Sequence, residues 1–388
     1  MKKCCSGKKI NCLLEKIESL KNNHGFIRYF KNTSWLFLEK VFRVLVGLFV
    51  GIWVARYLGP EQFGSFSFAQ SVVGLFTAIS TLGLDSIVIR ELLKDESKKN
   101  DLIGTSFFLK LMGAFAVLII LTLAINFSSS DIQTNTLVFI IASATIFQSF
   151  NVIDFYFQSK VLSKFVVYSN IIGLFISSLI KVILILNEAP LESFAWVVLF
   201  DSFVLACGLM YFYIKHNSES ILKNIKFNKK IAMCLLKDSW PLILTGMVIS
   251  IYMKIDQIMI KEILGSVAVG QYAAAVRLSD AWYFIPTVIA TSLFPAIINS
   301  KKISEELYYE RLQKLYNLMV LIAIPGAISM YFISDWVVEI LYGNQYYESG
   351  KVLLIHIWAG VFVFLGVASG KWYISENLQV LYFWRVFF

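Results

Sequence analysis

The sequence predicts an all-α polytopic membrane protein, and three observations support that fold class. Hydrophobic residues make up 57% of the 388-residue chain, whereas charged residues make up only 16%. A water-soluble domain carries about 25% charged residues, so one packed core could not absorb so many apolar side chains. The apolar residues fall in segments of about 20, the length that a helix needs to cross ~30 Å of hydrocarbon. Basic residues gather in alternate loops, as expected of a multi-pass protein.

Ten segments are predicted to span the membrane as helices, because backbone groups in lipid must pair within the segment. They cover residues 34–58, 65–88, 104–126, 135–158, 165–186, 192–214, 240–261, 268–298, 314–334 and 352–374. The first segment is too long for a cleavable signal peptide and lacks a small-residue cleavage site. The hydrophobic run 378–388 reads as the start of a further span, so we expect an incomplete second half.

The distribution of charge orients the chain. Twenty-four Lys and Arg residues lie in the leader and in every second loop, against Lys261 and Lys351 in the opposite loops. The positive-inside rule therefore predicts a cytoplasmic N-terminus. The net charge of +9 then needs no nucleic-acid partner, because the basic loops face an anionic inner leaflet. The loops are too short for a receptor domain or a soluble catalytic domain.

A glycine motif recurs at an offset of 206 residues: Gly59 and Gly64 follow the first span, and Gly265 and Gly270 follow the seventh. This repeat predicts two halves in the same orientation, related by an axis along the membrane normal, with a site between them. The expected domains are a basic leader (1–32), a six-helix N-terminal lobe (33–215), a cytoplasmic linker (216–238) and a C-terminal lobe (239–388) of about four full spans.

The first span carries charged and small residues at every fourth position: Glu39, Arg43, Gly47, Gly51 and Ala55. This spacing puts them on one helical face. Two interpretations stay open. The face could be a packing seam at the two glycines beside a structural Glu39–Arg43 pair. Alternatively, it could line a polar cavity with Arg43 facing a substrate.

Polar faces also occur on the second, seventh and eighth spans, the leading helices of the two halves. A charge retained within a span faces protein or water, so we expect a central, partly basic cavity, which suits an anionic substrate such as a diphosphate. The candidate cavity residues are Arg43, Lys254, Gln257 and Arg277, and the candidate ion-coupling residues are Asp85, Asp256 and Asp280. Pro286 is predicted to bend the eighth span, either for motion or for packing alone.

Other polar residues in the spans are given structural roles. Lys110, Lys181 and Lys371 lie near span ends, where long side chains snorkel to the interface. We interpret His356 as a packed, hydrogen-bonded histidine. The chain has no phosphate-binding loop, no HExxH and no GxSxG motif, and its three histidines and five cysteines form no metal-ligand pattern. We therefore expect no enzyme activity, no metal and no cofactor other than a proton or sodium gradient.

Two blocks of residues resemble bacterial polysaccharide transporters, the Wzx-type O-antigen flippases. The first comprises residues 42–43, 55–64, 83–85 and 90–92, and the second comprises residues 254–257, 270–272, 275, 277–278, 285–286 and 295. The resemblance implies a MATE-like architecture, two six-helix lobes around a V-shaped cavity. It implies translocation of an undecaprenyl-diphosphate-linked oligosaccharide across the bacterial inner membrane, without covalent chemistry. The diphosphate-binding arginines of related flippases map loosely onto Arg43 and Arg277.

The resemblance also makes a polysaccharide polymerase and a chain-length regulator candidate partners, besides the bilayer and the lipid-linked glycan. Three other functions are weighed against it. A multidrug cation antiporter of the same fold would need an acidic, aromatic cavity, whereas the charges here are mixed and lean basic. A membrane glycosyltransferase or polymerase usually needs a long outer loop with catalytic residues, and the outer loops here are short. A structural scaffold is the third alternative.

Overall fold

The computed structural model describes residues 24–127, 131–217, 226–301, 303–376, 378, 381 and 384–385, and every element among them is a helix. The predicted all-α fold class is confirmed. The leader up to residue 23, residues 218–225 of the linker and most of the run 378–388 lie outside the described part.

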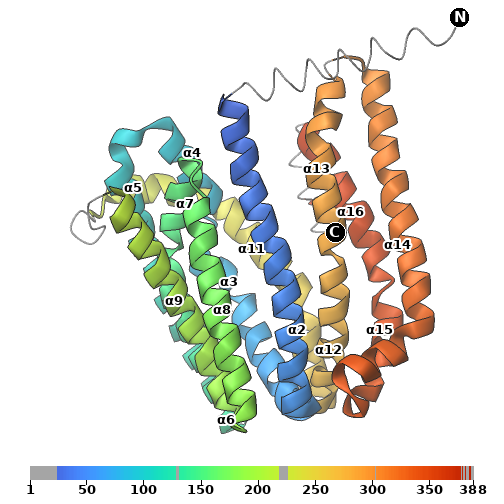
Figure 1. Cartoon of the computed structure of the whole chain (residues 1–388). Coiled ribbons are helices and arrows are strands. Elements are labelled where there is room, and N and C mark those ends of the chain that lie inside the picture. Colours follow the sequence, from blue (N-terminus) through green and yellow to red (C-terminus); the bar gives the residue numbers. More distant parts are fainter. Residues whose placement is uncertain are drawn as a thin grey trace, which may run out of the picture.

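The helices form two bundles (Figure 1). The first contains α2 (His24–Leu75), α3 (Thr77–Thr81), α4 (Asp85–Lys94), η1 (Glu96–Lys98), α5 (Lys99–Phe127), α6 (Ile132–Gln148), η2 (Ser149–Asn151), α7 (Val152–Ser159), α8 (Lys164–Leu186) and α9 (Leu191–Asn217). The second contains α11 (Lys229–Leu264), α12 (Ser266–Trp282), α13 (Phe284–Lys301), α14 (Glu305–Tyr342), η3 (Asn344–Tyr346), α15 (Tyr347–His356) and α16 (Ala359–Ser375).

Eight of the described helices are long and apolar enough to cross a membrane, and a bent pair, Asn344–His356 with Ala359–Tyr373, would make a ninth span. The first candidate, Ser34–Leu75, has 42 residues. That length is ~63 Å of helix, about twice the ~30 Å of hydrocarbon. The chain turns at Gly59, where φ is 71°, and then runs back (Figure 1). This one helix therefore supplies two passages, which correspond to the predicted spans 34–58 and 65–88.

Two predicted spans, 65–88 and 352–374, are wrong as continuous helices. Span 65–88 ends its first helix at Leu75 and is interrupted again at Leu82 and Gly83, where φ is positive. Span 352–374 is bent by 45° between α15 and α16. Span 268–298 lies within one candidate membrane span, Ser266–Lys301, with a local break at Tyr283. Pro286 explains this local break, since it has no N–H to donate to the carbonyl of Trp282 and would clash with it in a continuous helix.

Some helices also extend well beyond the predicted apolar segments. Helix α11 starts at Lys229 rather than at residue 240, because the Asn228 side chain caps it by accepting from the N–H groups of Lys230 and Ile231. Helix α14 starts at Glu305 rather than at residue 314, with Ser304 as its cap. Hydropathy marks the part of a helix that lies in hydrocarbon, whereas capping residues mark where the helix begins.

The two ends of the molecule differ in chemistry. One end, called the Gly59 end, contains the turns at Gly59, Gly265 and Gly343. The φ angles of these glycines are 71°, 88° and 85°, in the left-handed region that glycine adopts without strain. At the opposite end, called the basic end, the connections carry the Lys and Arg residues of segments 90–99 and 160–164. The bundles meet along α2, α11 and α12, and α12 packs against α2 (Figure 1).

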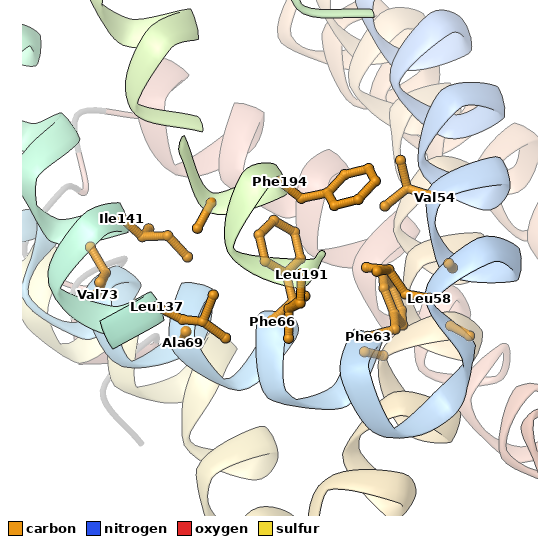
Figure 2. Packing of buried hydrophobic residues seen from close by; sticks show 14 of the residues in the cluster. Val54, Leu58, Phe63, Phe66, Ala69, Val73, Leu137, Ile141, Leu191 and Phe194 are labelled. Carbon is orange, nitrogen blue, oxygen red and sulfur yellow. The ribbon is translucent and has the colours of Figure 1, made fainter. Parts of the chain in front are cut away.

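The largest hydrophobic cluster lies beside the turn at the Gly59 end. Figure 2 shows side chains of α2 pointing toward those of α6 and α9, among them Phe66, Leu137 and Phe194. The cluster continues through Ala274 of α12 and Val338 of α14, so it includes both bundles. Burial of this shared apolar surface is what joins the bundles before any polar contact is considered.

Candidate functional site

Helices α2 and α12 cross at the two motif glycines. A Cβ at Gly64 would lie 1.8 Å from the carbonyl oxygen of Ser266, and a Cβ at Gly270 would lie 1.9 Å from that of Pro60. Beside them, the Ser65 hydroxyl donates to Oγ of Ser266 at 3.1 Å. The backbones of the two bundles therefore touch, and each copy of the repeat supplies the glycine that allows this.

Hydrogen bonds between the bundles surround this crossing. The Tyr346 hydroxyl donates to the carbonyl of Ala55 at 2.7 Å, and Nε2 of Gln345 donates to that of Arg56 at 2.6 Å. The Ser71 hydroxyl donates to Oε1 of Gln257 at 2.8 Å, in a buried contact. Gln257, a candidate cavity residue, thus lies in the contact between α2 and α11.

Arg277 lies in the groove that the glycines of the first span create. Its Nη2 donates to the carbonyl of Gly47 at 3.4 Å. A Cβ at Gly51 would lie 2.2 Å from its guanidinium carbon, so the missing side chain makes room for the cation. No described carboxylate forms an ion pair with Arg277, and its electrostatic neighbours include the hydroxyl of Tyr342 and the ammonium group of Lys181. At Gly51 the small-residue face of α2 thus packs against the second bundle and holds a cation, whereas the space over Gly47 is open.

Arg43 lies one helical turn from Gly47, toward the basic end. Its Nε donates to Oε1 of Glu39 at 2.8 Å, so the pair expected from their spacing forms. The two side chains differ in exposure: 48% for Arg43 and 9% for Glu39. Because the carboxylate is buried and the guanidinium is not, Arg43 still presents N–H groups to its surroundings. Arg43 and Arg277 therefore lie near the same turn of α2.

A second group of titratable side chains lies in the C-terminal bundle. The Tyr272 hydroxyl donates to Oδ2 of Asp256, and its ring meets that of His356 edge-on at 6.0 Å. Asp280 is exposed and interacts electrostatically with Lys254, His356 and Asp256. The candidate residues Lys254, Asp256 and Asp280 are therefore brought together between α11, α12 and α15. No group of three His, Cys, Asp or Glu side chains in the described part of the chain could hold a metal ion.

Asp85 lies apart from that group, in the N-terminal bundle. It is the first residue of α4 and accepts from Nζ of Lys110 at 3.1 Å. Lys110 is 3% exposed and its ammonium group lies 4.6 Å from the ring centre of Phe155. Asp154 of α7 is a further electrostatic neighbour of Lys110. Lys110 is thus neutralised within the bundle rather than snorkelling, and Asp85 is its main partner.

A family model for polysaccharide biosynthesis proteins matches residues 29–301. The chain belongs to the polysaccharide biosynthesis protein family. A Shigella flexneri protein described as a "Putative O-antigen transporter" is 25% identical over 334 residues, which are 81% of this chain and 77% of that protein.

Solved structures share the fold of this family member. The inward-facing conformation of a multidrug resistance MATE family transporter of the MOP superfamily aligns with a TM-score of 0.68 and 15% identity, over 89% of this chain and 84% of that one. A MOP superfamily transporter from Pyrococcus furiosus, reported with a binding pocket of reversed polarity, aligns with a TM-score of 0.60 and 13% identity, over 93% and 85%. The expected MATE-like architecture is confirmed.

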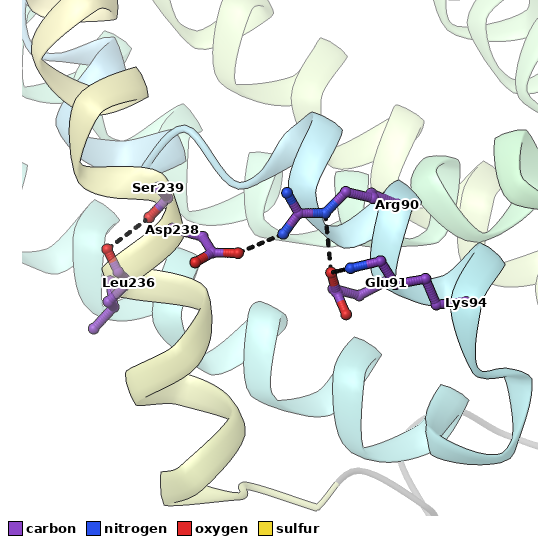
Figure 3. Close-up of polar contacts among 6 residues, drawn as sticks. All are labelled: Arg90, Glu91, Lys94, Leu236, Asp238 and Ser239. Atoms are coloured by element: carbon purple, nitrogen blue, oxygen red, sulfur yellow. Dashed lines mark hydrogen bonds and ion pairs between the residues drawn. The ribbon is translucent and has the colours of Figure 1, made fainter.

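Three residues of this polysaccharide biosynthesis protein have surroundings that the sequence does not predict. Lys181, which the sequence places at a snorkelling position, is an electrostatic neighbour of Arg277. His356, which is expected to be hydrogen-bonded, has a buried Nδ1 with no hydrogen-bond partner in the described part of the chain. Asp238 was not singled out, yet it pairs with Arg90 across the bundles (Figure 3). Each depends on a contact between helices far apart in the sequence, and no local pattern reports such contacts.

Proposed function

We propose that the protein translocates an undecaprenyl-diphosphate-linked oligosaccharide repeat unit across the bacterial cytoplasmic membrane, for O-antigen or a related surface polysaccharide. The observation that carries the proposal is Arg277, a cation at the contact between the two bundles that has no carboxylate partner among the described residues. An arginine in a membrane span costs ~2.5–3.5 kcal/mol on insertion scales, and a diphosphate would offset that cost through charge-assisted hydrogen bonds. The family match and the O-antigen transporter relative support this substrate class.

Alternating access is the proposed mechanism, and the contacts at the two ends suit it. The Gly59 end is closed by touching backbones at Gly64 and Gly270. At the basic end, α11 is held to the first bundle by the Arg90–Asp238 pair and by Ala232 and Leu235, which are buried in the apolar cluster of that bundle. Helix α13 meets α2 there at the stacked rings of Phe37 and Phe284, whose centres are 6.2 Å apart. We therefore expect this state to open at the basic end by separation of α13 from α2, because a side-chain contact is cheaper to break than the buried backbone crossing at the Gly59 end.

We place the basic end and the N-terminus in the cytoplasm. The excess of Lys and Arg in the connections at that end supports this orientation. The lipid-linked substrate is made at the cytoplasmic face in this proposal, so the end that opens more readily faces its source.

We assign coupling to a proton or sodium gradient to the group around Asp280. Asp280 is exposed, forms no ion pair within the part of the chain that the structure describes, and shares its surroundings with Asp256, Lys254 and His356. Asp85 is the weaker candidate, because Lys110 already neutralises it. Asp280→Asn is therefore expected to reduce gradient-driven transport in proteoliposomes several-fold without lowering the amount of folded protein. Unchanged transport in this variant would remove Asp280 from the coupling mechanism.

The decisive experiment is genetic complementation of a surface-polysaccharide flippase mutant that makes the cognate sugar repeat. The chain should restore surface polymer, and Arg43→Ala and Arg277→Ala should each reduce it while membrane protein levels stay near normal. Arg311→Ala is the matched control, because Arg311 lies at the basic end of α14 and donates to the carbonyl of Ala296 at 2.7 Å, away from the α2 face. Failure of the stably inserted wild type to complement, with a gain in resistance to cationic drugs, would favour the multidrug antiporter instead.

A further inference from the structure

Helix α8 runs beside α2 in a constant register. The rings of Trp35 and Tyr168 lie 5.7 Å apart, and those of Phe42 and Phe175 lie 5.6 Å apart. Both pairs are separated by 133 residues in sequence. Nearer the Gly59 end, the Tyr57 hydroxyl donates to the carbonyl of residue 189 at 2.9 Å, across 132 residues. The same offset places Lys181 of α8 level with Leu48 of α2.

Lys181 and Arg277 therefore approach one turn of α2 from opposite bundles. Leu48 follows Gly47, whose carbonyl accepts from Nη2 of Arg277. Lys181 is partly buried at this level, and Arg277 is one of its electrostatic neighbours. Arg43 lies one turn away on the same face as Gly47, about 6 Å along the axis. Three cations thus lie around a short stretch of α2, two from the first bundle and one from the second.

The one acidic neighbour of Lys181 in the described chain does not form an ion pair with it. Asp201 of α9 interacts with Lys181 electrostatically. Its Oδ1, however, lies 3.6 Å from where a Cβ of Gly173 would be. Gly173 precedes Lys181 by eight residues, which is ~12 Å along α8. Described carboxylates therefore do not fully balance the positive charges of Lys181 and Arg277. Buried charges of one sign are costly without an anion.

We infer that Lys181 joins Arg277 and Arg43 in an anion site that selects a diphosphate over a monophosphate. This inference rests on the proposed function and adds a residue and a specificity to it. A diphosphate has more charge and more acceptor oxygens than a monophosphate, and three separate cations can engage both of its phosphoryl groups. A monophosphate can contact fewer of the three cations. The site thus distinguishes a loaded polyprenyl-diphosphate carrier from an unloaded polyprenyl monophosphate.

The test measures binding of undecaprenyl diphosphate and undecaprenyl phosphate to the full chain in lipid nanodiscs. Lys181→Met should weaken diphosphate binding about tenfold or more, the effect of one lost charge-assisted hydrogen bond. Monophosphate binding should change much less. Lys181→Arg should retain the preference, and Lys181→Gln provides a second neutral variant if the methionine variant does not fold. Lys371→Met is the matched control, a span lysine packed 5.1 Å from the ring centre of Phe294.

A structural role for Lys181 predicts a different result. If Lys181 serves only to balance Asp201, the double variant Lys181→Met/Asp201→Asn should recover the affinity for diphosphate, and that recovery would overturn the inference. The anion site predicts no recovery. Diphosphate affinity that is lost in Arg277→Gln but kept in both neutral Lys181 variants would also overturn it, while leaving the proposed function intact. A wild type that binds neither probe would refute the proposed function itself.

Discussion

Gly64 and Gly270 show how single residues determine the contact between bundles. At each of these positions, a backbone carbonyl of the other bundle occupies the space that a side chain would fill. Gly64→Ala and Gly270→Ala should therefore destabilise the protein by about 1–3 kcal/mol or more, as overpacking does. Gly47→Ala is the control, because nothing lies within 4 Å of a Cβ there. Thermal unfolding in detergent would measure the effect, and equal stability of all three variants would contradict the close crossing.

Asp95, between α4 and η1, supplies a prediction of pH dependence. The Lys98 ammonium and then the Ser97 hydroxyl donate to its carboxylate and lower its pKa from 3.8 to about 2. Because the folded-state pKa is depressed, the carboxylate favours the local structure above pH ~4 and loses that effect as the pH falls toward 2. As the pH falls over this range, the rate of pepsin cleavage near η1 in the wild type should therefore rise relative to the rate in Asp95→Asn, in which this carboxylate is absent. A ratio of the two cleavage rates that does not change with pH would refute the stabilising role of the Asp95 carboxylate.

At the level of elements, the broken second span shows what hydropathy cannot report. Apolar residues continue through residues 65–88, so the pattern predicts one helix. The chain instead turns at Gly83, where φ is 57° and a Cβ would lie 2.8 Å from Cβ of Leu242 on α11. The break accommodates a helix from the other bundle, and its cause is absent from the local sequence.

The pair between α4 and α11 leads to a prediction about motion at the basic end. Arg90 of α4 binds Asp238 of α11 and donates from Nε to Glu91 at 2.9 Å, and Lys94 donates to Glu91 at 2.7 Å (Figure 3). Hydrogen bonds from Lys94 and then Arg90 lower the pKa of Glu91. These groups are exposed or partly exposed and screened by solvent, so Arg90→Ala should shift the open–closed equilibrium only a few-fold.

Cys234 can report that shift, because it is exposed on α11 one turn before Asp238. Its labelling by a maleimide should be faster in Arg90→Ala and in Asp238→Ala than in the wild type. Cys207, which is exposed on α9, is the internal reference, and the cysteines at positions 4, 5 and 12 would be replaced by serine. The charge-swapped variant Arg90→Asp/Asp238→Arg should restore the slower rate. Equal rates in all variants would show that the pair does not hold the basic end.

At the scale of the whole molecule, alternating access requires the Gly59 end to open. Ser65 and Ser266 lie on either side of the crossing with their Oγ atoms 3.1 Å apart, so cysteines placed there should form a cross-link. Oxidised Ser65→Cys/Ser266→Cys should lose transport in proteoliposomes and recover it on reduction. Each single variant under the same oxidant is the control. Full transport by the cross-linked protein would mean that the substrate passes without separation of the bundles at this end.

The sequence alone determined the class of molecule, most of its membrane passages and its internal repeat. These depend on composition, on alternation of charge and on motif spacing, which are local or periodic properties. The sequence also placed Arg43 and Arg277 among the candidates. Only the tertiary structure decided that Arg277 packs on Gly51, that Asp256 and Asp280 share surroundings with His356, and that Lys181 lies level with Leu48. These relations come from the packing of helices distant in sequence, so the order of residues along the chain does not encode them locally.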